Sequence, residues 1–213
     1  MKGGKRSSSD PLFRESALAV AHILGPESCV LIGGLAVAAY GHERATKDVD
    51  FITRLPLREA KERLAAHGLS VEVRRGDPAE GVPTFLRTNI AGVLVDVLPM
   101  LVAIDWERLP EVPLTPKGSI KVIDLDTLLL LKARAGGMQD VLDMTQLVLR
   151  NPDRLSLARE FAGRYGVGSK LESCLMDRRE QQKFVDGLPR QRRHHAKAEL
   201  KRLLEPGARS GQS

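Results

Sequence analysis

The stretch IGGLAVAAYGHERATKDVDF, residues 32–51, decides the fold. It begins at the end of a short apolar run, residues 28–32, that predicts a buried strand. Gly33 and Gly34 interrupt this run, and the small apolar residues after them predict a helix. The alternation of residues 49–53 predicts a second strand. The sequence therefore places a glycine turn between a strand and a helix, shortly before the next strand begins.

Two carboxylates open this second strand. Asp48 and Asp50 flank Val49, and side chains two residues apart on a strand point to the same face. Neighbouring carboxylates repel each other unless a cation lies between them. Hard oxygen ligands suit Mg²⁺ (or Mn²⁺), which proteins often share with substrate phosphates. The pair therefore predicts a divalent metal site at the start of the strand.

A third carboxylate, Asp96, stands inside the apolar run VLVDVLP at residues 93–99. Burying a lone aspartate costs several kcal/mol unless it is paired or metal-bound. Strand alternation places Asp96 on the face opposite Val95 and Val97. We expect Asp96 to join the metal site, and a role in capping a turn is the alternative.

The glycines complement such a metal site. Gly33 and Gly34 let the backbone approach a phosphate closely, and the N–H groups that open the following helix face an anion. In a two-metal site, one ion activates the attacking oxygen while the other holds the triphosphate and the leaving group. Carboxylates beside a glycine turn are therefore typical of phosphoryl or nucleotidyl transfer.

The same residues resemble the signature of the nucleotidyltransferase (polymerase beta-like) superfamily. That signature is a hydrophobic residue, Gly and Gly or Ser, a spacer, and then Asp-hydrophobic-Asp/Glu-hydrophobic. Residues 32–34 and 48–51 match it here, and Asp96 matches the third carboxylate of the family. The resemblance implies an α+β fold: a small mixed sheet with flanking helices (the nucleotidyltransferase fold), followed by a helical C-terminal region. It also implies NTP substrates, ATP among them, and Asp48, Asp50 and Asp96 as catalytic residues and metal ligands.

A closer resemblance is to the AbiEii/MenT-type branch, the toxin half of some toxin–antitoxin pairs. The run Arg44-Ala45-Thr46-Lys47-Asp48 fits its approach to the carboxylates, and Lys132 with Asp140-Val141-Leu142-Asp143 fits its downstream helical part. Gln139 stands where relatives often place a basic residue. The resemblance implies this set of nucleotide-binding residues: Gly33, Gly34, Arg44, Thr46 and Lys132.

Simpler interpretations stand beside these roles. Arg44 is also explained as a surface residue, and Lys132 as a long side chain that carries its charge to the edge of an apolar helix. Asp140 and Asp143 are also explained as surface charges near the beginning of a helix.

The rest of the sequence predicts a mixed α/β N-terminal part and a helical C-terminal part. We expect a disordered start over residues 1–10, a nucleotidyltransferase core over 11–118, a helical region over 119–204 and a disordered tail over 205–213. The pattern predicts helices over 11–24, 35–41, 56–67, 124–136, 138–150, 153–164, 169–185 and 190–204. It predicts further strands over 70–74, 83–88 and 92–98, with a turn at 89–92 and a short edge strand at 119–123.

Charge and composition restrict the kinds of partner that we expect the chain to bind. The net charge is +6 and the pI about 9.5, with many basic residues after Met176, which favours a polyanion. We expect an RNA acceptor such as a tRNA 3′ end, or a protein acceptor, and an antitoxin partner; a solvated helical surface is the alternative for the basic region. Two cysteines do not make a disulfide framework, so a reducing cytoplasm is expected. We find no apolar run that would span a membrane.

Two functions therefore stay open. The first is an enzyme that transfers an NMP from an NTP to a hydroxyl group. The second is a non-catalytic member of the same fold that binds a nucleotide or a partner.

Overall fold

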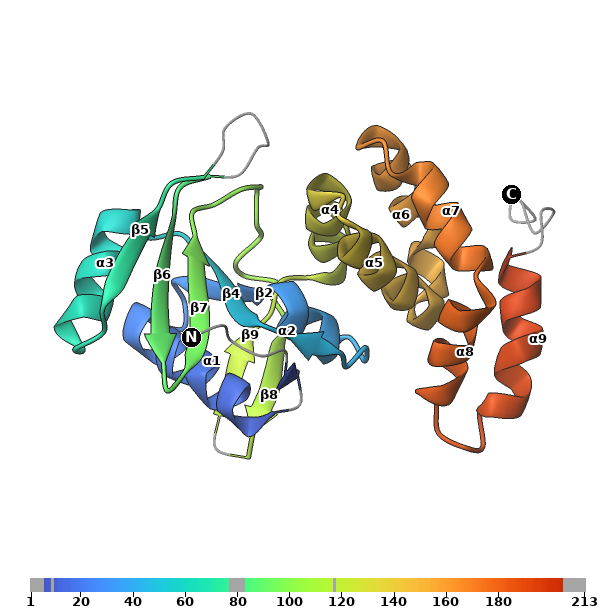
Figure 1. Ribbon diagram of the computed structural model, residues 1–213, viewed down its shortest axis with the longest axis horizontal. Helices are drawn as coiled ribbons and strands as arrows, with labels where there is room; N and C mark the ends of the chain where they lie inside the picture. Colours follow the sequence, from blue (N-terminus) through green and yellow to red (C-terminus); the bar gives the residue numbers. More distant parts are fainter. Residues whose placement is uncertain (1–5, 9, 77–82, 117, 205–213) are drawn as a thin grey trace. The chain divides into compact units, whose positions relative to one another are not determined.

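The computed structural model describes residues 6–8, 10–76, 83–116 and 118–204 (Figure 1). The chain divides into two compact units, Met1–Leu128 and Leu129–Ser213. The expected disordered start over 1–10 lies partly outside the described residues, and the expected tail over 205–213 lies wholly outside them.

The first unit contains strands and helices that the sequence predicts, together with three strands that it does not predict, over residues 6–7, 45–46 and 111–115. They are β1 (Arg6–Ser7), α1 (Pro11–Leu24), β2 (Cys29–Ile32), α2 (Gly33–Ala39), β3 (Ala45–Thr46), β4 (Asp48–Thr53), α3 (Leu57–Ala66), β5 (Val71–Arg74), β6 (Phe85–Ile90), β7 (Val93–Leu98), β8 (Glu111–Thr115), β9 (Gly118–Lys121) and the beginning of α4 (Leu125–Ala135). Helix α1 begins where the sequence predicts, because Asp10 Oδ1 accepts a hydrogen bond from Leu12 N–H at 3.0 Å.

A five-stranded mixed sheet is the centre of this unit. Its order is β2-β4-β7-β6-β5. Strands β4 and β7 are parallel, and the other neighbours are antiparallel. The α+β class, with a small mixed sheet, flanking helices and a helical C-terminal region, is therefore confirmed.

One face of the sheet forms the core. Leu31, Phe51, Val97 and Leu86 stand side by side across four strands, and all four are buried. Helix α1 contacts β2, β4 and β7, while α3 contacts β5, β6 and α1. Burying a side chain of this size contributes about 1.5–3 kcal/mol. The helices therefore fix this face of the sheet and leave side chains of the other face available for chemistry.

A tight turn sets the pairing of β6 with β7. Ala91 and Gly92 both have positive φ, 51° and 87°, as a two-residue type I′ hairpin requires. The Asn89 side chain accepts a hydrogen bond from Gly92 N–H at 2.9 Å. The predicted hairpin is thus confirmed, and its register places Arg87 opposite Asp96.

One expectation for the first unit is wrong in part. Residues 6–8 are ordered: β1 pairs with β3, Ser8 N–H donates to Arg44 O at 2.8 Å and Arg44 N–H donates to Ser8 Oγ at 3.1 Å. These backbone partners outweigh the disorder that the polar composition suggested. The strand expected at 119–123 pairs with β8 over most of its length. Its end lies along the edge of the main sheet, as predicted, since Val122 forms a parallel bridge with Leu31 and Ile123 N–H donates to Leu31 O at 3.0 Å.

The second unit is helical. It contains the rest of α4, then α5 (Met138–Arg150), a 3₁₀ turn (Pro152–Arg154), α6 (Leu155–Arg164), α7 (Gly168–Met176), α8 (Arg178–Asp186) and α9 (Arg193–Leu204). Helix α5 contacts α6, α7 and α8. The single helix expected over 169–185 is two helices, because Asp177 Oδ1 accepts from Arg179 N–H at 2.7 Å and begins α8. Across the described residues of both units, we find no helix with the length and apolar character needed to cross a membrane.

Candidate active site

A row of side chains crosses the face of the sheet opposite the core. The strand register aligns Ile32, Asp50, Asp96, Arg87 and Glu72 on five neighbouring strands. Directly paired residues of neighbouring strands lie on the same face of a sheet. We call this set the cross-strand row. It carries three carboxylates and one guanidinium group.

Asp48 adds another carboxylate to this face. It lies two residues before Asp50 on β4, and carboxylate oxygens of Asp48, Asp50 and Asp96 all lie within 4.8 Å of one another. We call these three residues the carboxylate triad. Asp96 is 6% exposed, and the other two are half-buried. The convergence that the sequence predicts is therefore present, and the catalytic roles of the three residues stay a prediction.

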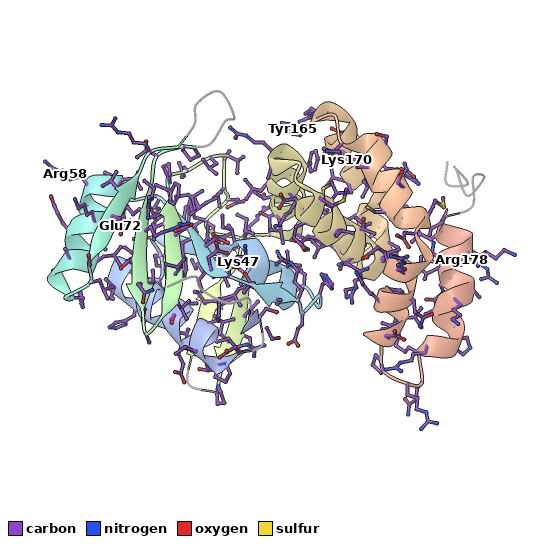
Figure 2. All side chains as sticks on the ribbon, in the orientation of Figure 1. Lys47, Arg58, Glu72, Tyr165, Lys170 and Arg178 are labelled. Atoms are coloured by element: carbon purple, nitrogen blue, oxygen red, sulfur yellow. The ribbon has the colours of Figure 1, made fainter. Side chains whose placement is uncertain are left out.

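The triad carries an electrostatic strain of its own. Burial raises the pKa of the Asp48 carboxyl group above its ordinary value, and the nearby charge of Asp96 raises it further. Arg87, Arg44 and Lys47 oppose this rise. Lys47, labelled in Figure 2, is the exposed residue between β3 and β4. Three carboxylates this close favour a bound cation, because it removes their mutual repulsion.

Gly33 is required where the triad meets the end of β2. Its φ is +65°, and a Cβ atom built there would lie 1.9 Å from Asp50 Oδ2. No side chain of any other residue fits this approach, since atoms without a covalent bond do not come so close. The sequence prediction that the glycine turn lies beside the carboxylates is confirmed by this contact.

Gly34 makes a similarly close approach to side chains of the segment that leads into β4. A Cβ atom there would lie 2.7 Å from Thr46 Oγ1 and 3.4 Å from Arg44 Nη1. Thr46 is buried, and its hydroxyl group donates to the carbonyl oxygen of Asp48 at 3.1 Å. Arg44 Nη1 donates to Ala45 O at 2.9 Å. Both residues thus lie next to the triad and support the strand that carries it.

Lys132 belongs to the second unit and lies between two carboxylates. Its Nζ is 2.8 Å from Asp140 Oδ1 and 2.9 Å from Asp143 Oδ2. Burial lowers the pKa of Lys132, but Asp143 and Asp140 outweigh burial and leave it raised. Gln139 also donates to Asp143 Oδ1, at 3.1 Å. We call Lys132, Asp140 and Asp143 the Lys132 cluster, and the role of Lys132 in nucleotide binding stays a prediction.

The triad fits a divalent ion such as Mg²⁺ or Mn²⁺. Mg²⁺ binds oxygen at about 2.0–2.1 Å, so two oxygens on one ion lie up to about 4 Å apart. The oxygens of the triad lie within 4.8 Å of one another, so small side-chain rotations bring them into range. Carboxylate oxygens are also the donor type that these ions prefer.

Arg87 is the residue of this site that the sequence prediction missed. Its guanidinium group donates from Nε to Asp96 Oδ1 at 2.7 Å and from Nη2 to Asp96 Oδ2 at 2.6 Å. A signal for it exists in the sequence. Counting outward from a two-residue turn at Ala91-Gly92 pairs position 87 with position 96 and brings opposite charges together.

Comparisons with known proteins give distant likenesses only. No family model matches the sequence, and no curated protein matches it. A provisionally named nucleotidyltransferase from H. pylori is similar in structure at 13% identity and a TM-score of 0.42, over 75% of this chain and 95% of that one. JHP933 from Helicobacter pylori is similar at 12% identity and a TM-score of 0.42, over 76% and 92%. A tRNA nucleotidyltransferase complexed with a primer tRNA and an incoming ATP analogue is similar at 12% identity and a TM-score of 0.37, over 90% and 64%. These likenesses are too distant to assign a substrate or a partner to this chain.

Proposed function

We propose that this chain is a metal-dependent nucleotidyltransferase of the polymerase beta-like superfamily. It transfers an NMP from an NTP to a hydroxyl group of RNA, such as a tRNA 3′ end, or of a protein. The bond between the α- and β-phosphates breaks, and pyrophosphate is released. The observation that carries the proposal is the carboxylate triad, whose oxygens lie within 4.8 Å of one another and whose Asp50 lies directly against Gly33. Carboxylates that converge beside a glycine turn suit a triphosphate and its divalent ions.

Each member of the triad has a proposed role. Asp48 and Asp50 hold Mg²⁺ (or Mn²⁺), and Asp96 is the third ligand, next to the attacking hydroxyl group. When bound, such ions neutralise phosphate charge and favour loss of the proton from the attacking oxygen. The buried strand β7 keeps Asp96 in a fixed position, which a reacting group requires.

The nucleotide contacts are proposed from residues beside the triad. Gly33 and Gly34 have no Cβ atom, and the side chains of Asp50 and Thr46 occupy the space where it would lie. The backbone N–H groups of these glycines, at the beginning of α2, are proposed to bind the β- and γ-phosphates. Arg44 supplies a positive charge for the phosphates, and Thr46 holds the strand that positions Asp48. Lys132 is proposed as a further contact to the triphosphate.

The basic surface of the second unit supports an RNA acceptor. Helices α8 and α9 carry exposed cationic residues that attract a polyanion: Arg178, Arg179, Lys183, Arg193, Lys197, Lys201 and Arg202. We further infer that the protein acts in the cytoplasm as the toxin of a toxin–antitoxin pair, with an antitoxin protein as its partner.

A labelling assay tests the reaction. The chain is incubated with each α-labelled NTP, Mg²⁺ and either total tRNA or cell protein, and we expect label on one acceptor class. Asp48→Asn and Asp96→Asn should each lower transfer by at least about 10²–10³-fold, the usual effect of losing one group that stabilises transition-state charge. Glu72→Gln is the matched control, because Glu72 ends the same row but is 61% exposed and pairs with Arg74.

Two results would change the proposal. Undiminished transfer by Asp96→Asn would reject the site. Binding of NTP and Mg²⁺ without label on any acceptor would favour the non-catalytic alternative, a nucleotide- or partner-binding member of the fold.

A further inference from the structure

We propose that Arg87 is a built-in counter-ion of the carboxylate triad, which holds the triad together without metal and keeps its affinity for free divalent ions low until a nucleotide binds. This inference rests on the proposed function, since it concerns how the same site takes up its ions. It assigns a positioning role to Arg87, because this residue acts through Asp96.

The contact between Arg87 and Asp96 is a two-point hydrogen bond between charged groups. Nε and Nη2 each donate to a different oxygen of Asp96, at 2.7 and 2.6 Å. The Asp96 side chain is only 9% exposed and that of Arg87 is 29% exposed. Such forked pairs are stronger and more directional than a single hydrogen bond. The contact therefore fixes the plane of the Asp96 carboxylate and leaves its remaining lone pairs for other ligands.

The position of Arg87 itself is fixed from two sides. The register of the β6–β7 hairpin places it directly opposite Asp96. Its guanidinium carbon also lies 5.5 Å from the centre of the Phe85 ring, a favourable contact between a cation and an aromatic face. The guanidinium group is thus held in place before any metal or nucleotide arrives.

The positive charge of Arg87 changes how strongly the triad attracts metal ions. Arg87 brings one positive charge to three carboxylates whose oxygens lie within 4.8 Å of one another. A bound nucleotide adds the negative charge of its triphosphate, which offsets this positive charge. Two nitrogens of Arg87 lie 2.6 and 2.7 Å from the two oxygens of Asp96, so its charge acts on the triad at contact distance. Removing the charge of Arg87 should therefore strengthen the attraction of the empty triad for free metal.

Two substitutions separate charge from geometry. Arg87→Met removes both the positive charge and the fork but keeps a long apolar side chain. Arg87→Lys keeps the charge but replaces the planar fork with a point donor. Arg58→Met is the matched control: Arg58, labelled in Figure 2, lies on α3 with its side chain 90% exposed.

The test measures Mn²⁺ binding to the full chain without nucleotide, by the loss of the free Mn²⁺ signal in electron paramagnetic resonance. We expect Arg87→Met to bind Mn²⁺ about tenfold more tightly than the wild type, as one unit charge at this range allows. Arg87→Lys and Arg58→Met should stay near the wild-type affinity. With NTP present, the difference between wild type and Arg87→Met should shrink.

The outcomes are distinguishable from those of the labelling assay, because Mn²⁺ binding needs no acceptor and no turnover. Equal or weaker Mn²⁺ binding by Arg87→Met would overturn the counter-ion role, as would absence of Mn²⁺ binding in every variant. If Arg87→Met does not fold, Arg87→Gln removes the same charge and gives the same test. Tighter binding by the charge-free variant in a chain that labels no acceptor would leave the counter-ion role standing and reject only the proposed reaction.

Discussion

The carboxylate triad of the first unit and the Lys132 cluster of the second unit combine acids with one cation in opposite ways. In the triad, three carboxylates lie together, Arg87 donates two hydrogen bonds to Asp96, and Asp48 and Asp50 remain half-buried. In the Lys132 cluster, two carboxylates enclose one ammonium group, and the Asp143 side chain is 0% exposed. The first arrangement gathers carboxylates at partly exposed positions that a ligand from solution reaches, while the second is closed around its own cation.

This difference separates a cluster that is strained until a cation binds from one whose cation is already paired before any nucleotide arrives. A buried charge is tolerated when a partner and hydrogen bonds satisfy it, and removing the partner is then strongly destabilising. A cluster with excess charge of one sign is strained by itself and gains from a ligand of the other sign. Loss of Lys132 should therefore destabilise the folded chain, whereas loss of Arg87 should raise the affinity of the triad for divalent metal ions.

The largest effect is expected in the Lys132 cluster. Lys132→Met should lower the free energy of unfolding by about 3–5 kcal/mol, because Asp143 would be buried without its cationic partner. Chemical denaturation of the full chain measures the loss. Lys170→Met, at an exposed position of α7 labelled in Figure 2, is the control and should change stability by less than about 0.5 kcal/mol. A loss as small as that of the control would mean that the cluster is not structural.

A smaller effect is expected at the glycine turn. Gly33→Ala places a Cβ 1.9 Å from Asp50 Oδ2 at a φ of +65°. Gly92→Ala is the matched control, since Gly92 also has positive φ (+87°) but nothing within 4 Å of a Cβ. Backbone strain should lower the free energy of unfolding of both variants by about 1–2 kcal/mol. The clash with Asp50 should lower it further in Gly33→Ala, and this variant should also lose Mn²⁺ binding. Thermal denaturation and Mn²⁺ titration check this. Equal losses of stability in the two variants would show that Asp50 moves aside at no cost.

The smallest effect is a pH dependence of the metal-free chain. The pKa of Asp48 is raised in the folded state, so its stabilising contribution is present below the ordinary carboxyl pKa and is lost as the pH rises through the folded value. At neutral pH, Asp48→Asn without metal should therefore be more stable than the wild type. The gain should stay below about 1 kcal/mol, because Asp48 is partly exposed and screened.

Urea denaturation between pH 4 and pH 8, in the presence of a chelator, measures this difference. Glu72→Gln serves again as the control and should follow the wild-type curve. Added Mg²⁺ should stabilise the wild type more than Asp48→Asn. The opposite result, in which the wild type gains stability relative to Asp48→Asn as the pH rises, would contradict the proposed repulsion within the triad.

The sequence by itself determined the local elements of the site. The break at Gly33-Gly34, the alternation around Val49 and the turn before Val93 come from backbone sterics and side-chain periodicity over a few residues. These short-range rules also placed Asp96 on the face opposite Val95 and Val97. For the same reason they overlooked the break at Asp177, where a local cap competes with a helical pattern on both sides.

Only the tertiary structure decided which groups meet. Asp50 lies opposite Asp96 because β4 and β7 are parallel neighbours, although they are far apart in the sequence. Arg87 meets Asp96 through the register of the local β6–β7 hairpin, whereas Ser8 reaches Arg44 through a pairing of distant strands that no local pattern announces. Pairing between distant strands depends on how the whole sheet buries its apolar face. The distances and charges of the triad therefore follow from packing, while the residue types that make a metal site conceivable are already present in the chain.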